Sequence, residues 1–145
     1  MTCLEVGAVI SANILLGASL QRFGGKLADK YSRRSMIIAG GLTTALALIL
    51  MPISGGFVAL LALNLFIGIG SAVSMPAATA MVVEHGRELG MGSTIGIFNT
   101  AMGIGMIVAP TASGIIMDAI SLESVFYFAS VMSVLGSAVF YYVSR

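Results

Sequence analysis

Charged side chains are rare in this sequence, yet five of them stand within the segment 24–34 (GGKLADKYSRR). The segment combines one carboxylate with four bases: Asp29, Lys26, Lys30, Arg33 and Arg34. A carboxylate beside a helix end can pair with a guanidinium such as that of Arg33 and accept hydrogen bonds from free backbone N–H groups. Each exposed ion pair contributes only about 0–1 kcal/mol, but several together can bias an equilibrium between two conformations. This chemistry suits a gate that opens and closes.

The rest of the sequence offers no catalytic or cofactor-binding pattern. It contains no nucleophile–base–acid constellation, no glycine-rich phosphate loop after a strand and no cluster of residues at metal-ligand spacing. The only histidine, His85, stands among charges, and the single cysteine, Cys3, excludes an intrachain disulfide. A net charge of +1 does not favour nucleic acid. We therefore expect no enzyme activity, no cofactor, no metal site and no nucleic-acid partner.

The charges also mark the ends of the elements that must position them. Hydrophobic residues make up 58% of the chain and charged residues 9%, against about 45–50% and about 25% in soluble domains. A membrane-spanning helix needs roughly 20 apolar residues, and the long uncharged stretch 35–83 is divided by the turn signal 52–56 (PISGG). The sequence predicts an all-α integral membrane protein with five transmembrane helices, at about 4–22, 35–52, 57–83, 91–117 and 122–143. Pro76 and Pro110 predict bends within the third and fourth of them.

The positive charges predict an orientation. All seven lysines and arginines fall in the segment 22–34, in the connection 84–90 or at the end of the chain, and the turns 52–56 and 118–123 carry none. Positive residues mark the cytoplasmic side, so a cytoplasmic anchor that only sets the topology is the alternative interpretation of the segment 24–34. We therefore expect a multi-pass protein of the cell membrane with its N-terminus outside and its C-terminus in the cytoplasm.

The segment 25–34 resembles motif A of the major facilitator superfamily of secondary transporters, G-x-L-a-D-[RK]-x-G-R-[RK]. The matching residues are Gly25, Leu27, Asp29, Lys30, Arg33 and Arg34. Ser32 replaces the second glycine of the motif. The resemblance implies a cytoplasmic gating loop between two helices of a six-helix half, in a transporter that works by alternating access. It also implies that Arg33 or Arg34 pairs with Glu84, close to Arg87.

The stretch 105–114 (GMIVAPTASG) resembles motif C of drug/proton antiporters of the same superfamily, G-x-x-x-G-P-x-x-G-G. The corresponding positions are Gly105, Ala109, Pro110, Ser113 and Gly114, with Ala109 and Ser113 in place of two glycines. Small residues four apart let helices approach closely, so generic helix packing is the alternative interpretation.

Polar side chains within the predicted spans are few. Asn13, Asn64 and Asn99 are predicted either to bind another helix or to line a cavity. No charged residue stands in the middle of a predicted span, so a proton relay, which usually uses a buried carboxylate, is expected elsewhere.

A complete member of the superfamily has twelve helices in two similar halves. We expect residues 1–145 to form a single partial membrane domain equivalent to helices eight to twelve, with helices two to six as the alternative. Its expected partners are the lipid bilayer, the missing helices of the transporter and a small-molecule substrate of unknown identity. Two other interpretations stay open, a small self-associating helical membrane protein without transport activity and a non-functional truncated remnant.

Overall fold

The computed structural model describes residues 3–144, without the side chains of residues 3–6, 8, 9, 16, 22 and 27–29. The described residues form five α-helices and one short 3-10 helix, and no strand. In chain order these are α1 (Cys3–Lys30), α2 (Arg33–Leu50), η1 (Met51–Ile53), α3 (Phe57–Leu89), α4 (Met91–Ala119) and α5 (Leu122–Val143). The predicted all-α fold and its five helices are confirmed.

Two helices extend well beyond their predicted ends, α1 by eight residues and α3 by six, and both corrections fall on the charged end of the molecule. The predicted loop 22–34 is helical as far as Lys30, so that only Tyr31 and Ser32 separate α1 from α2. The predicted connection 84–90 is helical as far as Leu89. Charge shows where the apolar span ends, but a helix can continue into water because each further turn satisfies its own backbone hydrogen bonds. At Gly90 the backbone adopts a φ of 101°, which favours glycine, and α3 ends there.

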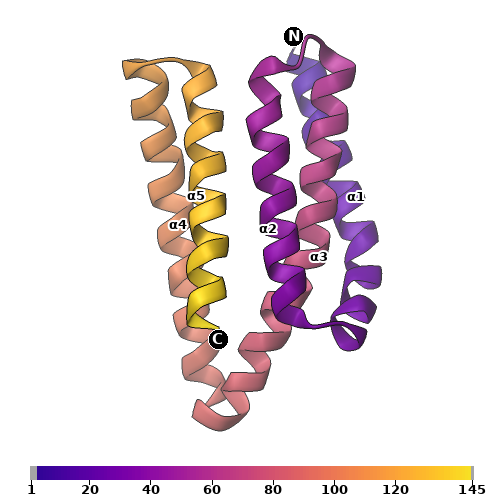
Figure 1. Cartoon of the computed structure of the whole chain (residues 1–145), viewed down its shortest axis with the longest axis vertical. Helices are drawn as coiled ribbons and strands as arrows, with labels where there is room; N and C mark the ends of the chain where they lie inside the picture. The colour runs from indigo at the N-terminus through magenta and orange to yellow at the C-terminus, as the bar shows by residue number, and fades with distance from the viewer. Residues whose placement is uncertain (1–2, 145) are drawn as a thin grey trace.

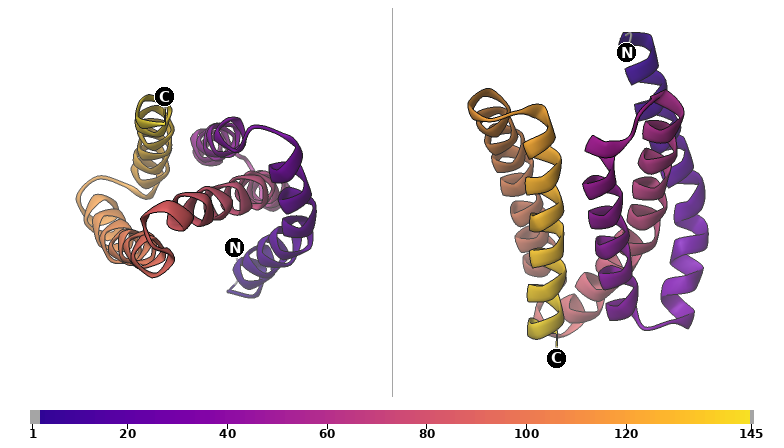
Figure 2. Two further views of the ribbon diagram at one scale, coloured as in Figure 1. Left: turned by 90° about the horizontal axis from the view of Figure 1, so that it is seen from below. Right: turned by 45° about the horizontal axis from the view of Figure 1, so that its top comes forward.

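α3 is the central helix of the bundle. It packs along α1 on one side and along α2 on the other, and α2 in turn packs against α5. Figure 1 shows α3 leaning towards α4 at its lower end, and Figure 2 shows α4 standing apart from α1 and α2. The connections α1–α2 and α3–α4 lie at the lower end of Figure 1, together with the C-terminus of the chain.

The interior of this bundle is built mainly from alanine, glycine and serine, with two methionines, and its outside is apolar. The buried hydrophobic residues are Met36, Ala45, Ala47, Met51, Ala72 and Ala77. Large apolar side chains such as Val58, Met106 and Val143 are instead more than 70% exposed. This distribution fits a solvent of lipid chains, in which helices associate through close packing rather than through apolar burial.

Four helices among the described residues are long and apolar enough to cross a membrane. They are α2 together with η1 (Arg33–Ile53), α3, α4 and α5. The composition and these helices make the chain a multi-pass membrane protein. That α1 is the fifth span remains a prediction.

Candidate functional site

The residues of the motif A-like segment lie where three helix ends meet. Gly25 and Lys30 belong to the last turns of α1, and Arg33 and Arg34 open α2. Ser32 stands between the two helices with a φ of −59°, a value open to any residue, so serine in place of glycine causes no strain here. The side chains of Leu27 and Asp29 lie outside the described part of the structure. The predicted gating loop is therefore a helix end followed by a two-residue connection.

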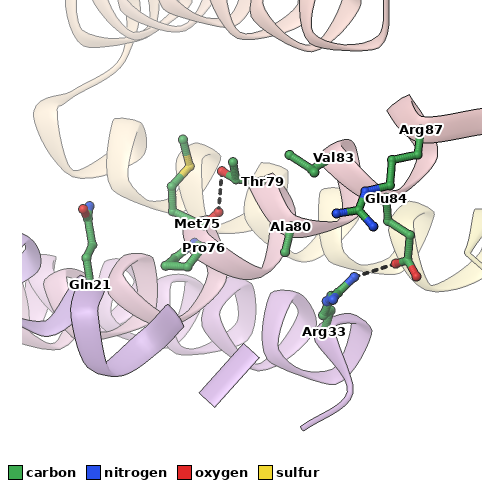
Figure 3. A pocket seen from close by; sticks show the side chains of 9 residues that line it. All are labelled: Gln21, Arg33, Met75, Pro76, Thr79, Ala80, Val83, Glu84 and Arg87. Atoms are coloured by element: carbon green, nitrogen blue, oxygen red, sulfur yellow. Dashed lines mark hydrogen bonds and ion pairs between the residues drawn. The ribbon is translucent and has the colours of Figure 1, made fainter. Parts of the chain in front are cut away.

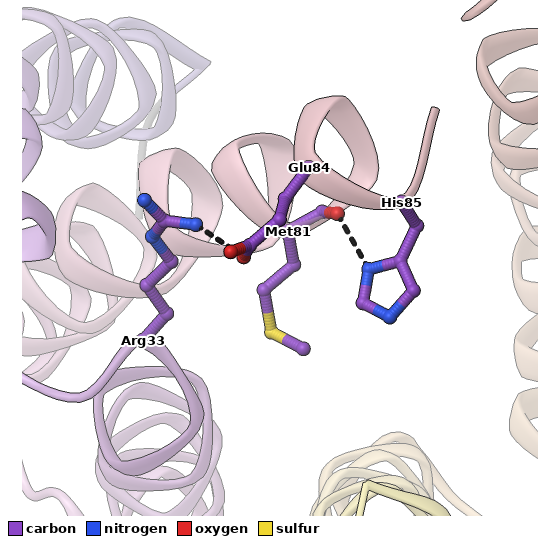
Figure 4. Close-up of polar contacts among 4 residues, drawn as sticks. All are labelled: Arg33, Met81, Glu84 and His85. Atoms are coloured by element: carbon purple, nitrogen blue, oxygen red, sulfur yellow. Dashed lines mark hydrogen bonds and ion pairs between the residues drawn. The ribbon is translucent and has the colours of Figure 1, made fainter. Parts of the chain in front are cut away.

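Arg33 forms an ion pair with Glu84 near the end of α3. Its Nη1 donates to Glu84 Oε2 at 2.5 Å, and the two side chains are 32% and 65% exposed (Figure 4). The sequence led us to expect this contact for Arg33 or Arg34, and the structure contains it with Arg33. The pair also suits the dipole of α2, because Arg33 is the first residue of that helix and the Glu84 carboxylate therefore lies beside its positive N-terminal end.

Arg34 contacts a different helix. Its Nη2 donates at 2.5 Å to the backbone carbonyl oxygen of Tyr141, and its guanidinium carbon lies 4.7 Å from the centre of the Tyr141 ring. Tyr141 is in the last turn of α5, where carbonyl groups lack partners within the helix. The two adjacent arginines thus attach the beginning of α2 to the ends of α3 and α5.

Glu84, Arg87 and His85 all lie on the last turns of α3. Among the side chains that the structure describes, the Arg33–Glu84 contact is the one ion pair, so Arg87 is near the pair without joining it. His85 is exposed and its Nδ1 lies 2.9 Å from the carbonyl oxygen of Met81 within the same helix (Figure 4).

An open pocket of about 710 Å³ adjoins this ion pair. It is formed by α1, α2 and α3, and Figure 3 shows its lining. The polar side chains around it are those of Gln21, Arg33, Thr79, Glu84 and Arg87. The Thr79 hydroxyl donates to the carbonyl oxygen of Met75 in its own helix, at 3.0 Å. Gln21 and Arg87 make no hydrogen bond with another side chain that the structure describes, and their amide and guanidinium groups line the pocket.

The three asparagines have different surroundings. Asn13 of α1 donates through Nδ2 to the backbone carbonyl oxygen of Asn64 in α3, at 2.5 Å. A side-chain atom of Asn13 also lies against Gly68, which brings the two helices close. Asn13 is thus in a helix–helix contact, while Asn99 is exposed on α4.

None of the motif C-like residues is buried against another described helix. Gly105, Ala109 and Pro110 are exposed, and a Cβ added to Gly105 or Gly114 would have no atom within 4 Å. Ser113 and Gly114 are half-buried. No residue of α4 is buried. Close packing by this stretch stays a prediction that needs a partner helix.

The serines of α5 make polar contacts with α2 that were not predicted from the sequence. Ser130 donates to the carbonyl oxygen of Ala45 and Ser133 to that of Gly41, both at 2.9 Å. Ser137 is buried, and a Cβ on Gly41 would overlap its hydroxyl. The spacing 130, 133, 137 places the three on one face of a helix, which is the signal that could have identified them.

Comparison with known proteins supports a common origin over almost the whole chain. The family model described as Major Facilitator Superfamily matches residues 2–145. An uncharacterized MFS-type transporter of Methanocaldococcus jannaschii is 30% identical over 141 residues, which cover 97% of this chain and 36% of that protein. The multidrug resistance protein MdtG of Proteus mirabilis is 26% identical over 143 residues, covering 98% of this chain and 35% of that protein.

MdtG of Salmonella paratyphi A is 27% identical over 138 residues, covering 94% of this chain and 34% of that protein. The chain thus spans about a third of the length of the curated relatives that it matches. No solved structure matches it. The match of the family model to residues 2–145, which agrees with the all-helical fold of the described residues, shows that this chain belongs to the Major Facilitator Superfamily.

Proposed function

We propose that the chain is part of a secondary transporter that moves a small solute across the membrane by alternating access. The observation that carries the proposal is the Arg33–Glu84 ion pair at the end of the motif A-like segment. This pair joins the start of α2 to the lower turns of α3, so that making or breaking it can favour one of two helix arrangements. Asp29 is proposed as the acid of the same network. A relative named as an MFS-type transporter supports this assignment, as do relatives named as multidrug resistance proteins.

Further helices are the proposed partners of this chain. α4 has no buried residue, and a groove of about 300 Å³ runs between α2, α3 and α5. Small residues line much of this groove, among them Gly41, Ser74, Ala78 and Ser137. Such a surface admits a closely packed helix. In each relative, the part outside the match is about twice as long as the matched part and can supply such a helix. We place the chain at helices eight to twelve of a twelve-helix protein, with helices two to six as the alternative.

The experiment uses the complete transporter that contains this segment, produced in cells lacking their main efflux pumps. Arg33→Gln and Glu84→Gln remove one charge each and keep the side-chain size similar, and Asp29→Asn does the same for the proposed acid. Each variant should insert normally and lose most transport of a panel of small solutes, normalised to the amount of inserted protein. Glu88→Gln is the matched control, because Glu88 is exposed on the same helix and makes no ion pair with a described side chain.

The charge exchange Arg33→Glu with Glu84→Arg should restore part of the transport lost in the single variants. Transport at the wild-type rate by the Arg33, Glu84 and Asp29 variants would show that the segment only anchors the protein. A complete gene product without further helices, forming oligomers and moving no solute, would favour the self-associating protein instead.

A further inference from the structure

α3 contains a carbonyl group that its own helix cannot satisfy. Pro76 has no N–H, so it cannot donate to the carbonyl oxygen of Ala72 four residues earlier. Ala72 is only 2% exposed. Within a membrane, a freed carbonyl of this kind needs another partner, and a neighbouring helix is one source of it.

Gly24 of α1 covers this carbonyl. A Cβ added to Gly24 would overlap the carbonyl oxygen of Ala72 and would lie 3.4 Å from Cγ of Pro76. The bare Cα of Gly24 therefore lies directly on the freed oxygen, where its C–H groups can act as weak donors. A larger residue at position 24 could not approach α3 in this way.

The two parts of α3 on either side of this contact are held differently. Residues 57–72 form the upper part, which is packed through glycines. Gly68 lies against Asn13, and Gly70 lies so close to Gly40 that an added Cβ would stand 2.9 Å from the Gly40 carbonyl oxygen. Residues 77–89 form the lower part, which begins at the buried Ala77, packed with Met36 of α2, leans towards α4 (Figure 1) and is tied near its end by the exposed Arg33–Glu84 pair.

We propose that Gly24, Ala72 and Pro76 form a hinge at which the lower part of α3 bends relative to the upper part. Pro76 removes the hydrogen bond that would stiffen the helix, and Gly24 compensates the freed carbonyl without fixing the lower part. Arg33 and Glu84 then hold one position of the lower part, and α4, which follows directly after Gly90, moves with it. The use of this bend in gating rests on the proposed function, whereas the hinge itself does not.

The hinge can be measured on this chain in lipid nanodiscs, as a distance within α3. Spin labels at Val58→Cys and Glu88→Cys, both exposed, report the length of α3 in a Cys3→Ser background. A straight helix would place the two positions about 45 Å apart. We expect wild type to give a shorter and broader distance distribution, and Pro76→Ala, which returns the N–H, to give a longer and narrower one.

Gly24→Ala should shift the distribution away from that of wild type, because the added methyl group displaces α1 from Ala72. Gly17→Ala is the matched control on the same helix, since a Cβ there meets no atom within 4 Å, and it should leave the distribution unchanged. Equal distributions for wild type and Pro76→Ala would overturn the hinge, even if Gly24→Ala failed to fold. Equal distributions for Gly24→Ala and Gly17→Ala would overturn the part assigned to Gly24. Neither result depends on transport, so the hinge and the proposed function can fail separately.

Discussion

Arg33 and Arg34 are unfavourably placed with respect to their own helix. Both stand in the first turn of α2, where the helix dipole is positive and the helix has no acidic residue of its own to offset it. Each instead lies at the C-terminal end of another helix, Arg33 at α3 and Arg34 at α5. Two residues that are adjacent in the sequence therefore contact two different helices, α3 and α5.

The Arg34–Tyr141 contact uses the ring and the backbone of the tyrosine but not its hydroxyl. Tyr141→Phe should thus leave the free energy of unfolding nearly unchanged, and Tyr141→Ala should lower it by about 1–2 kcal/mol through loss of the cation–π contact. Unfolding by sodium dodecyl sulfate in mixed micelles measures the difference. Equal stability of the Phe and Ala variants would show that the ring contributes nothing.

Asn13 and Asn64 offer a test in which the two partners behave differently. The bond runs from the side chain of Asn13 to the backbone oxygen of Asn64. Asn13→Ala should destabilise the chain by about 0.6–2 kcal/mol, which is the range of hydrogen bonds between membrane helices. Asn64→Ala keeps the backbone acceptor and should cost less in the same unfolding assay. If Asn64→Ala cost as much as Asn13→Ala, the side chain of Asn64 rather than its backbone would be the important group.

At the scale of elements, α2 is joined to its two neighbours by different chemistry. Against α3 it uses close backbone approach, as between Gly40 and Gly70. Against α5 it uses serine hydroxyls bonded to its carbonyl groups. Both arrangements need small residues, because a large side chain on either face would separate the helices.

The tight contact of Ser137 with Gly41 predicts sensitivity to size. Ser137→Leu should destabilise the α2–α5 pair by about 1–3 kcal/mol through overpacking, whereas Ser137→Ala should have a much smaller effect. Ser19→Leu is a suitable control, because Ser19 is exposed on α1. A Ser137→Leu variant as stable as the control in the unfolding assay would contradict the packing of α5 on α2.

At the scale of the whole molecule, the positive charges gather at the end where α1 meets α2 and α3 meets α4. This arrangement predicts that this end faces the cytoplasm. The opposite end carries the turn after η1 and the connection between α4 and α5.

Ser32 and Ser54 stand near opposite ends of α2 and can be compared directly. In a Cys3→Ser background, Ser54→Cys should react with an impermeant thiol reagent added outside intact cells. Ser32→Cys should react only after the membrane is permeabilised. Rapid labelling of Ser32→Cys from outside would reverse the proposed orientation.

The sequence by itself determined which elements form. The span of α5 was predicted at 122–143 and is found at Leu122–Val143. A stretch of about 20 mostly apolar residues can be recognised from the local sequence alone, and this is the length that a helix needs to cross a bilayer. The acid partner of the arginines at the start of α2 could also be expected, through the resemblance of the segment to motif A.

Only the tertiary structure decided which residues meet. Tyr141 is 107 positions from Arg34, and nothing in the local sequence relates them. The contact of Gly24 with Ala72 and Pro76 likewise depends on how closely α1 and α3 approach. In a lipid environment, apolar patterning does not select the neighbours of a helix, because lipid chains are as apolar as leucine. Small residues and polar groups select the neighbours of a helix instead. Which of these residues meet is seen only in the packed arrangement of the helices.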